Sequence, residues 1–585
     1  MSDWVRAMAV DDIADGGGRS FAHLDKRIAL FRTARGVFAC DNRCPHQGYA
    51  LVRGDVKDGV LTCAWHNWKF ELGSGTCRYG GENIRTYPVR ITDGHVFIDV
   101  ADPPAEIIRP DLFRSLAAAM DDLDIGRVAR DTMRLHRIGT PLADVVAEGV
   151  RYAAPRAEYG WDHSLATLTD CLRMSRYFAE SLRALPVIQG LSVAAEDQVR
   201  RPLRSRPEPV DPVAAYGSVA DALRAYPVLV DDERSDEAEA LLRGLIAAGA
   251  SPAELRHTLL TAVTDHFLAY GHSMIFVQKA FDLLDQIGWQ EADAVLSPLV
   301  PEMVLGTRYD KLPYMRKFLR AWGETAPDLD ALASRPAVGG FDQLGYRKAL
   351  TDGSAQEALG ALVRALGGGA PVTAVIDATG RAAAERLARF DINLDLDDTN
   401  EFGWLDVTHT LTYLNALRWA WSADPSPQML RGLFHAAWFV QWTGQFDGRE
   451  GAGNGRPKPH EHEDAAQVRA AIARRDPDAA MALVDGFAGP RAELERSLIQ
   501  AAAEDHSTAP IMVAHVVKTA QAAVEESRAL GGGQGATEPM AAAARFLASP
   551  KRERFVLQST LDALTTLRGI PKPESDLVRP ATRTA

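Results

Sequence analysis

Two short stretches, CPH at residues 44–46 and CAWH at residues 63–66, decide how this chain is interpreted. Together they read C-x-H-x16-C-x2-H, so each stretch supplies one cysteine and one histidine. Two such pairs, each on a short loop, can grip a metal centre from opposite sides. The pattern therefore predicts a metal site close to the N-terminus of the chain.

The ligand types favour a [2Fe–2S] cluster with two thiolates on one iron and two imidazoles on the other. Its ligands would be Cys44, His46, Cys63 and His66. A Cys2His2 zinc site places two cysteines before two histidines, whereas the two types alternate here. The remaining alternative is a chance meeting of buried cysteines and histidines, which the specificity of the motif disfavours.

These residues resemble the Rieske family. The resemblance extends to Gly48 and Leu51 after the first pair and to Trp65, Trp68 and Phe70 around the second. It implies a small all-β domain that carries the cluster and passes electrons to another metal.

The resemblance also bears on the redox potential. High-potential members carry an extra cysteine in each pair and join the two in a disulfide, but Tyr49 and Trp65 stand at those places here. We therefore expect a potential in the lower half of the Rieske range. Cys40 and Cys77 lie outside the pairs and are expected to be small core residues.

Length and composition narrow the function classes. A chain of 585 residues is too long for one hydrophobic core and predicts several domains. The net charge of −13 argues against nucleic acid and anionic membranes as partners. We find no apolar run long enough to span a bilayer and no hydrophobic signal region, and five cysteines do not form a disulfide framework. These features predict a cytoplasmic protein.

The pattern of residues predicts a multidomain protein, a small all-β domain followed by a large, mainly α-helical domain. Runs rich in β-branched and aromatic residues occur at 28–31, 60–63, 86–91 and 95–100, with turn signals between them. The expected divisions are a Rieske domain at residues 1–102, a linker at 103–140, an α-helical catalytic domain at 141–570 with a flexible loop at 448–464, and a C-terminal tail at 571–585.

Several helices are expected from local signals. Residues 251–254 read SPAE, a capping box with proline at the first helical position. Residues 507–510 open a second helix that is expected to run to about Arg528. The segments 408–421 and 430–442 are apolar enough to be buried helices.

No nicotinamide or flavin module is apparent, because the glycines at 531–533 lack the preceding strand and the spacing of a dinucleotide fingerprint. Electrons are therefore expected from a separate NAD(P)H-dependent reductase or a ferredoxin. The oligomeric state is left open, with a homo-oligomer among the options.

A cluster attached to a second domain predicts a second metal. A two-histidine, one-carboxylate triad is disfavoured, because His266 and His272 lie about 240° apart around a helix and no flanking pattern matches. A di-iron bundle needs two Glu-x-x-His motifs, and only Glu254 to His257 fits, as a surface turn. Whether His266 or His272 binds metal stays open at this point.

The helical part resembles the questin oxidase-like family. The resemblance is carried by an early Asp-His, a Gly-His before an amphipathic helix, a Thr-His-Thr-Leu-Thr segment and a late His-x-x-Lys. Members are all-α oxygenases of polycyclic quinones. The resemblance implies one iron held by four histidines and a carboxylated lysine, which here would be His163, His272, His409, His515 and Lys518. His409 and His515 would be the catalytic residues.

The chemistry of that set is coherent. His515 and Lys518 share a helix face. Burial lowers the pKa of a lysine, and the neutral amine can take up CO2 to give an anionic oxygen ligand. Imidazole ligands need hydrogen-bond acceptors on their other nitrogen. Four aspartates lie close in sequence to the candidate histidines and could act as these acceptors: Asp162, Asp265, Asp406 and Asp505.

Each residue has an ordinary alternative as a core or surface group. His435 is expected to be a core or pocket histidine, His460 and His462 to be solvated, and Lys518 could extend its stem to water. A stripe of aromatic residues flanks His409 and His435 and is either core or a pocket for a flat substrate: Trp404, Tyr413, Trp419, Trp421, Trp438, Phe439 and Trp442.

The sequence thus predicts a non-haem iron oxygenase. Electrons would pass from the [2Fe–2S] cluster to a mononuclear iron that acts with O2 on an organic, aromatic or polycyclic compound, by hydroxylation or oxidative ring cleavage. The alternative is an electron-transfer or redox-sensing protein whose helical part is a docking scaffold without metal.

Overall fold

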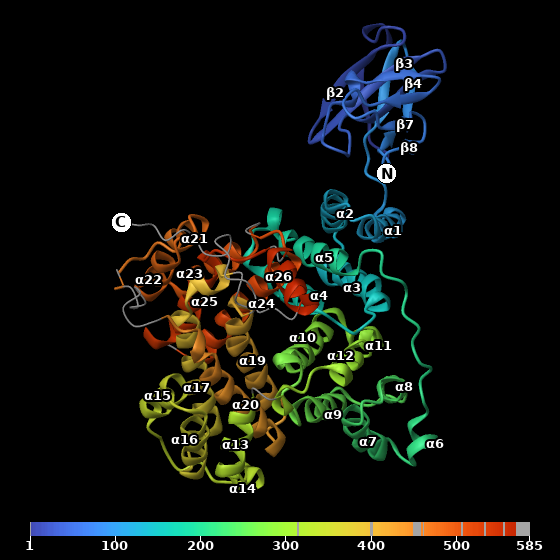
Figure 1. Cartoon of the computed structure of the whole chain (residues 1–585). Coiled ribbons are helices and arrows are strands. Elements are labelled where there is room, and N and C mark those ends of the chain that lie inside the picture. Colours follow the sequence, from blue (N-terminus) through green and yellow to red (C-terminus); the bar gives the residue numbers. More distant parts are fainter. Residues whose placement is uncertain are drawn as a thin grey trace. The chain divides into compact units, whose positions relative to one another are not determined.

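The computed structural model describes residues 2–568 except 313–314, 398–401, 449–457, 460, 505–506, 532–533 and 554–555. The chain divides into two compact units, residues 1–141 and 142–585. The first is β-rich and the second is helical (Figure 1), which confirms the expected fold class.

The first unit contains three antiparallel sheets, with strand orders β1-β11-β10, β2-β3-β4-β9 and β5-β6-β7-β8. The strands are β1 Trp4–Ala9, β2 Gly18–His23, β3 Lys26–Thr33, β4 Gly36–Asp41, β5 Asp55–Lys57, β6 Val60–Thr62, β7 Lys69–Glu71, β8 Cys77–Tyr79, β9 Thr86–Tyr87, β10 Val89–Thr92 and β11 His95–Asp99. The four expected strand regions match β3, β6, β9 with β10, and β11. Strand β3 supplies buried side chains to two apolar cores, one of which also contains Cys40, Cys44 and Cys63.

The segment expected to be a linker, 103–140, forms two helices, α1 (Ala105–Asp121) and α2 (Ile125–Arg137), which belong to the first unit. Arg130 and Arg134 of α2 bind Glu82, whose side chain is only 4% exposed. The Arg130 Nε donates to Glu82 Oε2 at 2.8 Å. The division between the compact units therefore follows α2, near Pro141.

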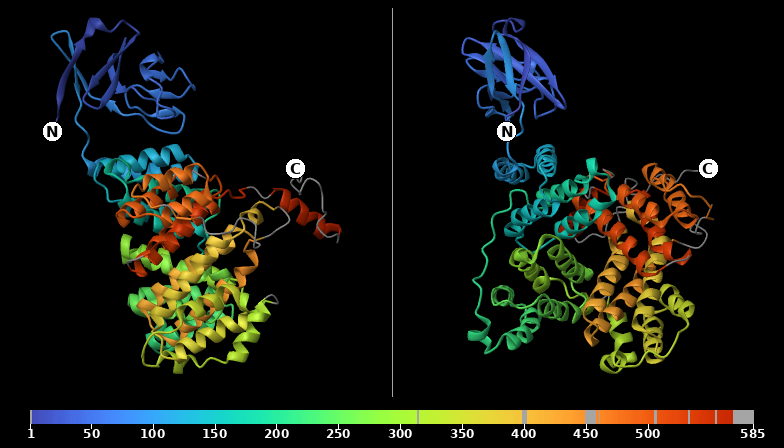
Figure 2. Two further views of the ribbon diagram at one scale, coloured as in Figure 1. Left: turned by 90° about the vertical axis from the view of Figure 1, so that its left-hand side faces the viewer. Right: turned by 180° about the vertical axis from the view of Figure 1, so that it is seen from behind.

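The second unit is built of helices. They are α3 Leu142–Ala153, α4 His163–Met174, α5 Leu185–Gln198, α6 Pro212–Tyr216, α7 Val219–Asp231, α8 Ser235–Ala247, α9 Pro252–Thr264, α10 His272–Ile287, α11 Ala292–Leu296, α12 Leu299–Leu305, α13 Arg316–Thr325, α14 Leu329–Ala333, α15 Gln343–Asp352, α16 Ala355–Gly367, α17 Val372–Arg389, α18 Ile392–Leu396, α19 Trp404–Ala423, α20 Pro427–Trp442, α21 Ala466–Ala473, α22 Pro477–Asp485, α23 Arg491–Ala502, α24 Pro510–Ala529, α25 Glu538–Ala548 and α26 Val556–Arg568. An extended segment, residues 199–211, runs along the outside of this unit between α5 and α6 (Figure 2).

Four helices form the core that positions the candidate site. Helix α4 packs on α10, α10 on α19, α19 on α24, and α24 on α4, which closes a ring. Every helix expected from local signals is present. Ser251 and Glu254 make the capping box of α9, and α24 begins at Pro510 and ends at Ala529.

Within the described residues, no helix combines the length and the apolar character that a bilayer-spanning segment needs. The expected tail, 571–585, and most of the expected loop at 448–464 lie outside the described residues.

Candidate metal centres

The two loops of the N-terminal unit bring together the four residues that the sequence selects. Cys44 and His46 follow β4, and Cys63 and His66 connect β6 to β7. Backbone bonds shape each loop, from Gly48 N to Cys44 O at 2.7 Å and from Asn67 N to Cys63 O at 3.2 Å.

The chemistry of these side chains fits a [2Fe–2S] cluster. The imidazole rings of His46 and His66 lie 4.5 Å apart, and both cysteines are only 2% exposed. Burial, with a smaller contribution from the neighbouring Cys63, raises the pKa of the Cys44 thiol to about 11. Nδ1 of His46 is buried and has no hydrogen-bond partner among the described residues, as suits a ligand atom.

Aromatic rings surround the cluster ligands. Trp68 stacks on His46 with centroids 5.0 Å apart, and Trp65 stacks on His66 at 4.9 Å. Tyr49 contacts Trp65, so the two positions that hold cysteines in high-potential Rieske proteins form an aromatic pair here. All five cysteines are described and each is a free thiol; Cys40 is fully buried and Cys77 is partly buried, as expected of core residues.

In the helical unit, the structure brings together the four histidines of the proposed set. His163 and His272 are the first residues of α4 and α10, His409 lies in α19, and His515 lies in α24. One nitrogen from each lies within 4.8 Å of the others. We call these four histidines the histidine cage. Lys518 joins it, with Nζ 2.9 Å from His409 Nε2.

Backbone carbonyls fix the orientation of three cage histidines. The Nδ1 atom of His272 donates to Ala269 O at 2.6 Å, that of His515 donates to Ile511 O at 2.7 Å, and that of His409 donates to Leu405 O. A donating Nδ1 leaves Nε2 as a bare lone pair. These rings therefore present acceptor atoms to the centre of the cage.

The acceptor atoms face one another at short range. Nε2 of His272 lies 2.9 Å from Nε2 of His409 and 3.1 Å from Nε2 of His163. Nε2 of His515 is buried and has no partner among the described residues. Two imidazole lone pairs at this distance repel unless a cation lies between them. Nitrogens bound at about 2.1 Å and at right angles to one another on a metal are about 3.0 Å apart, so the cage has the spacing of a metal site.

The pKa values of the cage histidines and of Lys518 also fit a metal site. Burial, with a further contribution from Lys518, lowers the pKa of His272 to about 3. Burial also holds the pKa values of His163, His409 and His515 well below their usual range. Lys518 is fully buried, and burial, assisted by the nearby Lys279 ammonium, lowers its pKa well below its ordinary value. The cage is thus neutral and ready to bind a cation.

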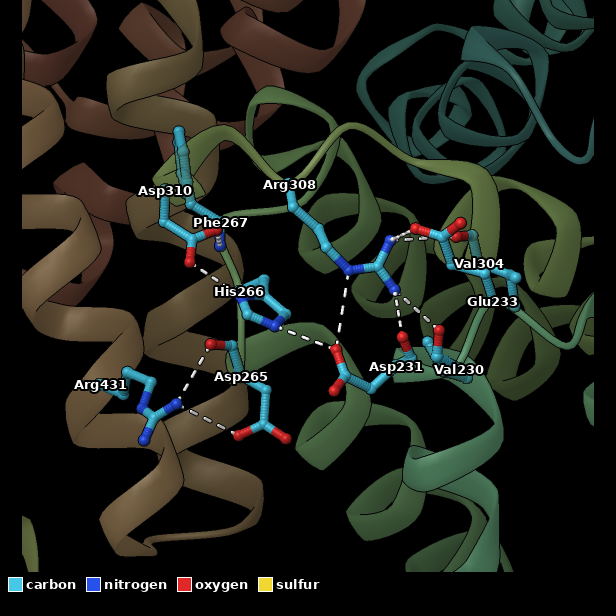
Figure 3. Close-up of polar contacts among 10 residues, drawn as sticks. All are labelled: Val230, Asp231, Glu233, Asp265, His266, Phe267, Val304, Arg308, Asp310 and Arg431. Atoms are coloured by element: carbon cyan, nitrogen blue, oxygen red, sulfur yellow. Dashed lines mark hydrogen bonds and ion pairs between the residues drawn. The ribbon is translucent and has the colours of Figure 1, made fainter. Parts of the chain in front are cut away.

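His266 is not part of the cage and lies between Asp310 and Asp231 (Figure 3). Its Nδ1 bonds to Asp310 at 2.7 Å and its Nε2 bonds to Asp231 at 3.1 Å, so both ring nitrogens are engaged by carboxylates. Arg308 also contacts Asp231. Of the two histidines left open by the sequence, His272 is the one that joins the cluster.

The expectation that carboxylates orient the cage histidines is wrong for three of the four aspartates. Asp162 caps α4 by accepting from Ser164 N, and Asp406 accepts from Gly403 N at the start of α19. Asp265 pairs with Arg431, as Figure 3 shows, and Asp505 lies outside the described residues. The acceptors that orient His272, His409 and His515 are backbone carbonyls three or four residues earlier in the chain, since a carbonyl oxygen has a second lone pair that can accept from an imidazole N–H.

In the helical unit, histidines outside the cage lie in the core or at the surface. His435 is buried against Phe267 and Phe318, as expected. His257 is exposed and pairs with Asp424. His462 is partly buried and donates to Leu483 O at 2.7 Å, so the expectation that it is solvated is wrong, and His460 lies outside the described residues.

Five of the seven residues of the aromatic stripe fall into two groups by what they pack against. Trp404, Trp438 and Tyr413 are fully buried core residues. Phe439 and Trp442 instead pack around Tyr270, whose ring lies 5.7 Å from the ring of His409. The sequence did not single out Tyr270, although its position two residues before His272 is a usable signal.

Sequence reasoning also missed a second layer of buried polar residues on the cage helices. Asp170 and Lys279 form a fully buried ion pair at 2.7 Å. Each lies seven residues after a cage histidine on the same helix, His163 and His272. Seven residues are two helical turns, so a search at this interval would have found the layer.

Comparisons with known proteins identify the N-terminal unit. A model of the Rieske [2Fe-2S] domain matches residues 3–88. The naphthalene 1,2-dioxygenase system ferredoxin component of Pseudomonas putida is 30% identical over 100 residues, which are 17% of this chain and 96% of that protein. The 4beta-methylsterol monooxygenase of Methylococcus capsulatus is 41% identical over 88 residues, which cover 13% of this chain and 24% of that protein.

Among solved structures, the ferredoxin of Sphingomonas yanoikuyae B1 is 27% identical, and the match covers 17% of this chain and all of that chain, with a TM-score of 0.16. The relatives are components of oxygenase systems or a monooxygenase, and they match the N-terminal part alone. The chain belongs to the Rieske family, with its [2Fe–2S] domain at residues 3–88.

Proposed function

We propose that this chain is an O2-dependent oxidoreductase in which the Rieske domain feeds electrons to an iron held by the histidine cage. The ligands would be His163, His272, His409 and His515, with Lys518 as the fifth group. The observation that carries the proposal is the pair of Nε2 atoms, in His272 and His409, that face each other at 2.9 Å while the Nδ1 atom of each ring donates to a backbone carbonyl. An iron bound there would supply a centre at which O2 is reduced by electrons that arrive one at a time.

Lys518 is proposed to bind as a carbamate. Its amine is fully buried and its pKa lies well below the usual value because of burial, so it is a nucleophile for CO2 at neutral pH. The carbamate would add one negative charge to a set of neutral imidazoles. The resemblance to the questin oxidase-like family supports the same assignment.

The substrate is proposed to be a flat aromatic or polycyclic compound. Tyr270, Phe439 and Trp442 form an aromatic wall on the His409 side of the cage. Such walls bind flat rings by stacking and exclude water. Hydroxylation or oxidative ring cleavage would follow, with electrons from a separate NAD(P)H-dependent reductase or ferredoxin, as in the systems that the relatives' names describe.

The ratio of iron to acid-labile sulfide tests the proposal. The intact chain should contain about three irons for about two sulfides, because the cluster accounts for two of each. His409→Ala and His515→Ala should lower the iron to about two per chain and leave the sulfide unchanged. His435→Ala, which removes a buried histidine outside the cage, is the matched control and should keep about three.

Two irons in the wild-type chain, with no further loss in the cage variants, would instead support the electron-transfer scaffold. About four irons would indicate a dinuclear helical site.

A further inference from the structure

Two helical turns beyond the cage, the same helices carry a second buried polar layer. We call it the charge layer: Asp170 and Arg173 of α4, Lys279 and Asp282 of α10, and Gln521 and Glu525 of α24. Lys518 and Glu525 are seven residues apart, as are His163 and Asp170, and His272 and Lys279. Because a helix rises about 1.5 Å per residue, the two layers lie about 10 Å apart along the helices.

Hydrogen bonds and ion pairs connect the charge layer across three helices. Lys279 Nζ bonds to Asp170 Oδ1 at 2.7 Å, and Arg173 contacts both Asp282, at 2.9 Å, and Glu525, at 2.8 Å. Gln521 donates to Glu525 at 2.8 Å. The network therefore consists of two bonded groups, Asp170 with Lys279 and Arg173 with Asp282, Glu525 and Gln521, which interact through their charges.

The network reaches from the interior to the surface. Asp170 and Gln521 are fully buried, whereas the side chains of Arg173 and Glu525 are 26% and 21% exposed. Gln521 is one helical turn from Lys518 on the same face of α24. The inner end of the network thus lies beside the cage and the outer end lies at the solvent.

Three acceptors of the layer have no donor among the described residues: Asp170 Oδ2, Asp282 Oδ2 and Gln521 Oε1. Buried acceptors of this kind are commonly satisfied by ordered water, which makes about three hydrogen bonds to such groups. A file of waters between the acceptors would link them into a path that conducts protons.

We propose that the charge layer delivers protons from solvent to the histidine cage, with Asp170 as the carboxyl group that exchanges them. The inference rests on the proposed function, because hydroxylation of a C–H bond by O2 consumes two electrons and two protons and yields the hydroxylated product and water. The electrons come from the reductase through the Rieske domain. Each proton that Asp170 releases inward is replaced from solvent through Glu525, so the layer is restored.

The charges around Asp170 suit this role. The groups that face it are Lys279 and Asp282 of α10, Lys518 and Glu525 of α24, and Arg173 of its own helix. Burial raises the pKa of Asp170 to about 6, against the lowering effect of the Lys279 ammonium. Burial also raises the pKa of Asp282 to about 6. Groups that titrate near neutral pH exchange protons readily in both directions.

Infrared spectroscopy of the full-length chain tests the proposal without relying on turnover. A protonated buried carboxyl should give a C=O band that disappears as the pH is raised through about 6, and the band should shift on transfer to D2O. The charge-balanced double variant Asp170→Asn with Lys279→Gln should lose the Asp170 component of the band, obtained as the difference from the wild type, because Asp282 and Asp406, whose pKa values are also raised to about 6, keep their own components. Glu239→Gln, which alters a buried carboxylate paired with Arg204, is the control and should keep the Asp170 component.

A variant that interrupts the charge layer tests whether the layer transports protons. Gln521→Leu should keep the band and its titration but slow the D2O shift, raise the solvent isotope effect on turnover, and lower kcat about tenfold at unchanged KM. The iron-to-sulfide ratio of this variant should equal that of the wild type. An Asp170 component that does not titrate between about pH 5 and 7, or an equally fast D2O shift of that component in Gln521→Leu, would overturn the proposal.

The two proposals can fail separately. If the wild-type chain holds only about two irons per chain, the proposed function fails, whereas the band and its exchange still report whether the layer conducts protons.

Discussion

At the level of single residues, the two metal sites differ in how far the sequence predicts them. The spacing of Cys44, His46, Cys63 and His66 is specific enough to name both the cluster and its ligands. Successive cage histidines are 109, 137 and 106 residues apart along the chain (163 to 272, 272 to 409 and 409 to 515), and only the family resemblance selected them. Their geometry depends on helix packing, which spacing along the chain does not encode.

The aspartates beside the cage histidines show why local patterns mislead. Asp162 and Asp406 precede or begin helices, and an acidic residue at a helix start satisfies free backbone N–H groups. The Asp-His proximity therefore reflects helix capping, while carbonyls one turn earlier orient the rings.

Lys518 gives a prediction at this scale. Lys518→Ala should lose the cage iron, because the anionic ligand is removed, and a small carboxylate such as propionate should restore part of it. Iron per chain, with and without propionate, is the measurement. Lys551→Ala is a matched control, since burial also lowers the pKa of Lys551, to about 7, at a site outside the cage. Equal iron in Lys518→Ala and the wild type would contradict the assignment.

The neutral cage histidines predict a pH dependence of stability. Their folded pKa values lie below the unfolded value near 6.5, so at lower pH the unfolded chain binds protons that the folded metal-free chain excludes. Stability is therefore fully present above about pH 6.5 and falls as the pH drops. In metal-free protein, His272→Asn should reduce this slope by about 1.4 kcal/mol per pH unit between pH 6 and 4. Urea unfolding at several pH values measures the slope, and an unchanged slope would show that His272 is not held neutral.

At the level of elements, the entry into α10 positions His272. Ala269, Tyr270 and Gly271 have φ values of 45°, 60° and 84°, and Ala269 O accepts the bond from His272. A Cβ on Gly271 would lie 2.7 Å from the Tyr413 ring. Local sequence signals mark the start of α10 only weakly, so this turn could not be predicted from them.

Gly271→Ala should therefore displace His272. We expect a loss of cage iron and a destabilisation of about 2–3 kcal/mol from backbone strain and the clash. Gly249→Ala is the matched control, because Gly249 also has a positive φ, 79°, but its Cβ would meet no atom within 4 Å. Gly249→Ala should lower the free energy of unfolding by about 1 kcal/mol and keep the cage iron. Thermal unfolding of both variants measures the cost of backbone strain. Iron analysis of both variants shows whether His272 is displaced from the cage.

At the level of the whole molecule, the first compact unit extends beyond the matched Rieske domain. The sequence analysis places the boundary at residue 102, whereas α1 and α2 belong to the same unit as the sheets. Contacts of Glu82 with Arg130 and Arg134 join α2 to the cluster-bearing sheets. Composition predicts a helical segment poorly when its main contacts are ion pairs with a distant loop.

This difference yields a prediction for truncated chains. A chain of residues 1–141 should hold its [2Fe–2S] cluster and be more stable than a chain of residues 1–102, by about 1–3 kcal/mol, because the latter loses the arginines that bind Glu82. Thermal unfolding followed by the visible absorbance of the cluster compares them. Equal stability of the two truncated chains would mean that α1 and α2 contribute nothing to the stability of the first unit.

Oxidation of the reduced cluster by O2 tests the central claim, that the Rieske domain supplies electrons to a metal in the histidine cage. In stopped-flow experiments with the full-length chain, the cluster absorbance should return faster in the wild type and in His435→Ala than in His515→Ala, where the cage lacks a ligand. The contrary result is reoxidation at one rate in all three proteins, which would mean that the cage takes no part in electron transfer.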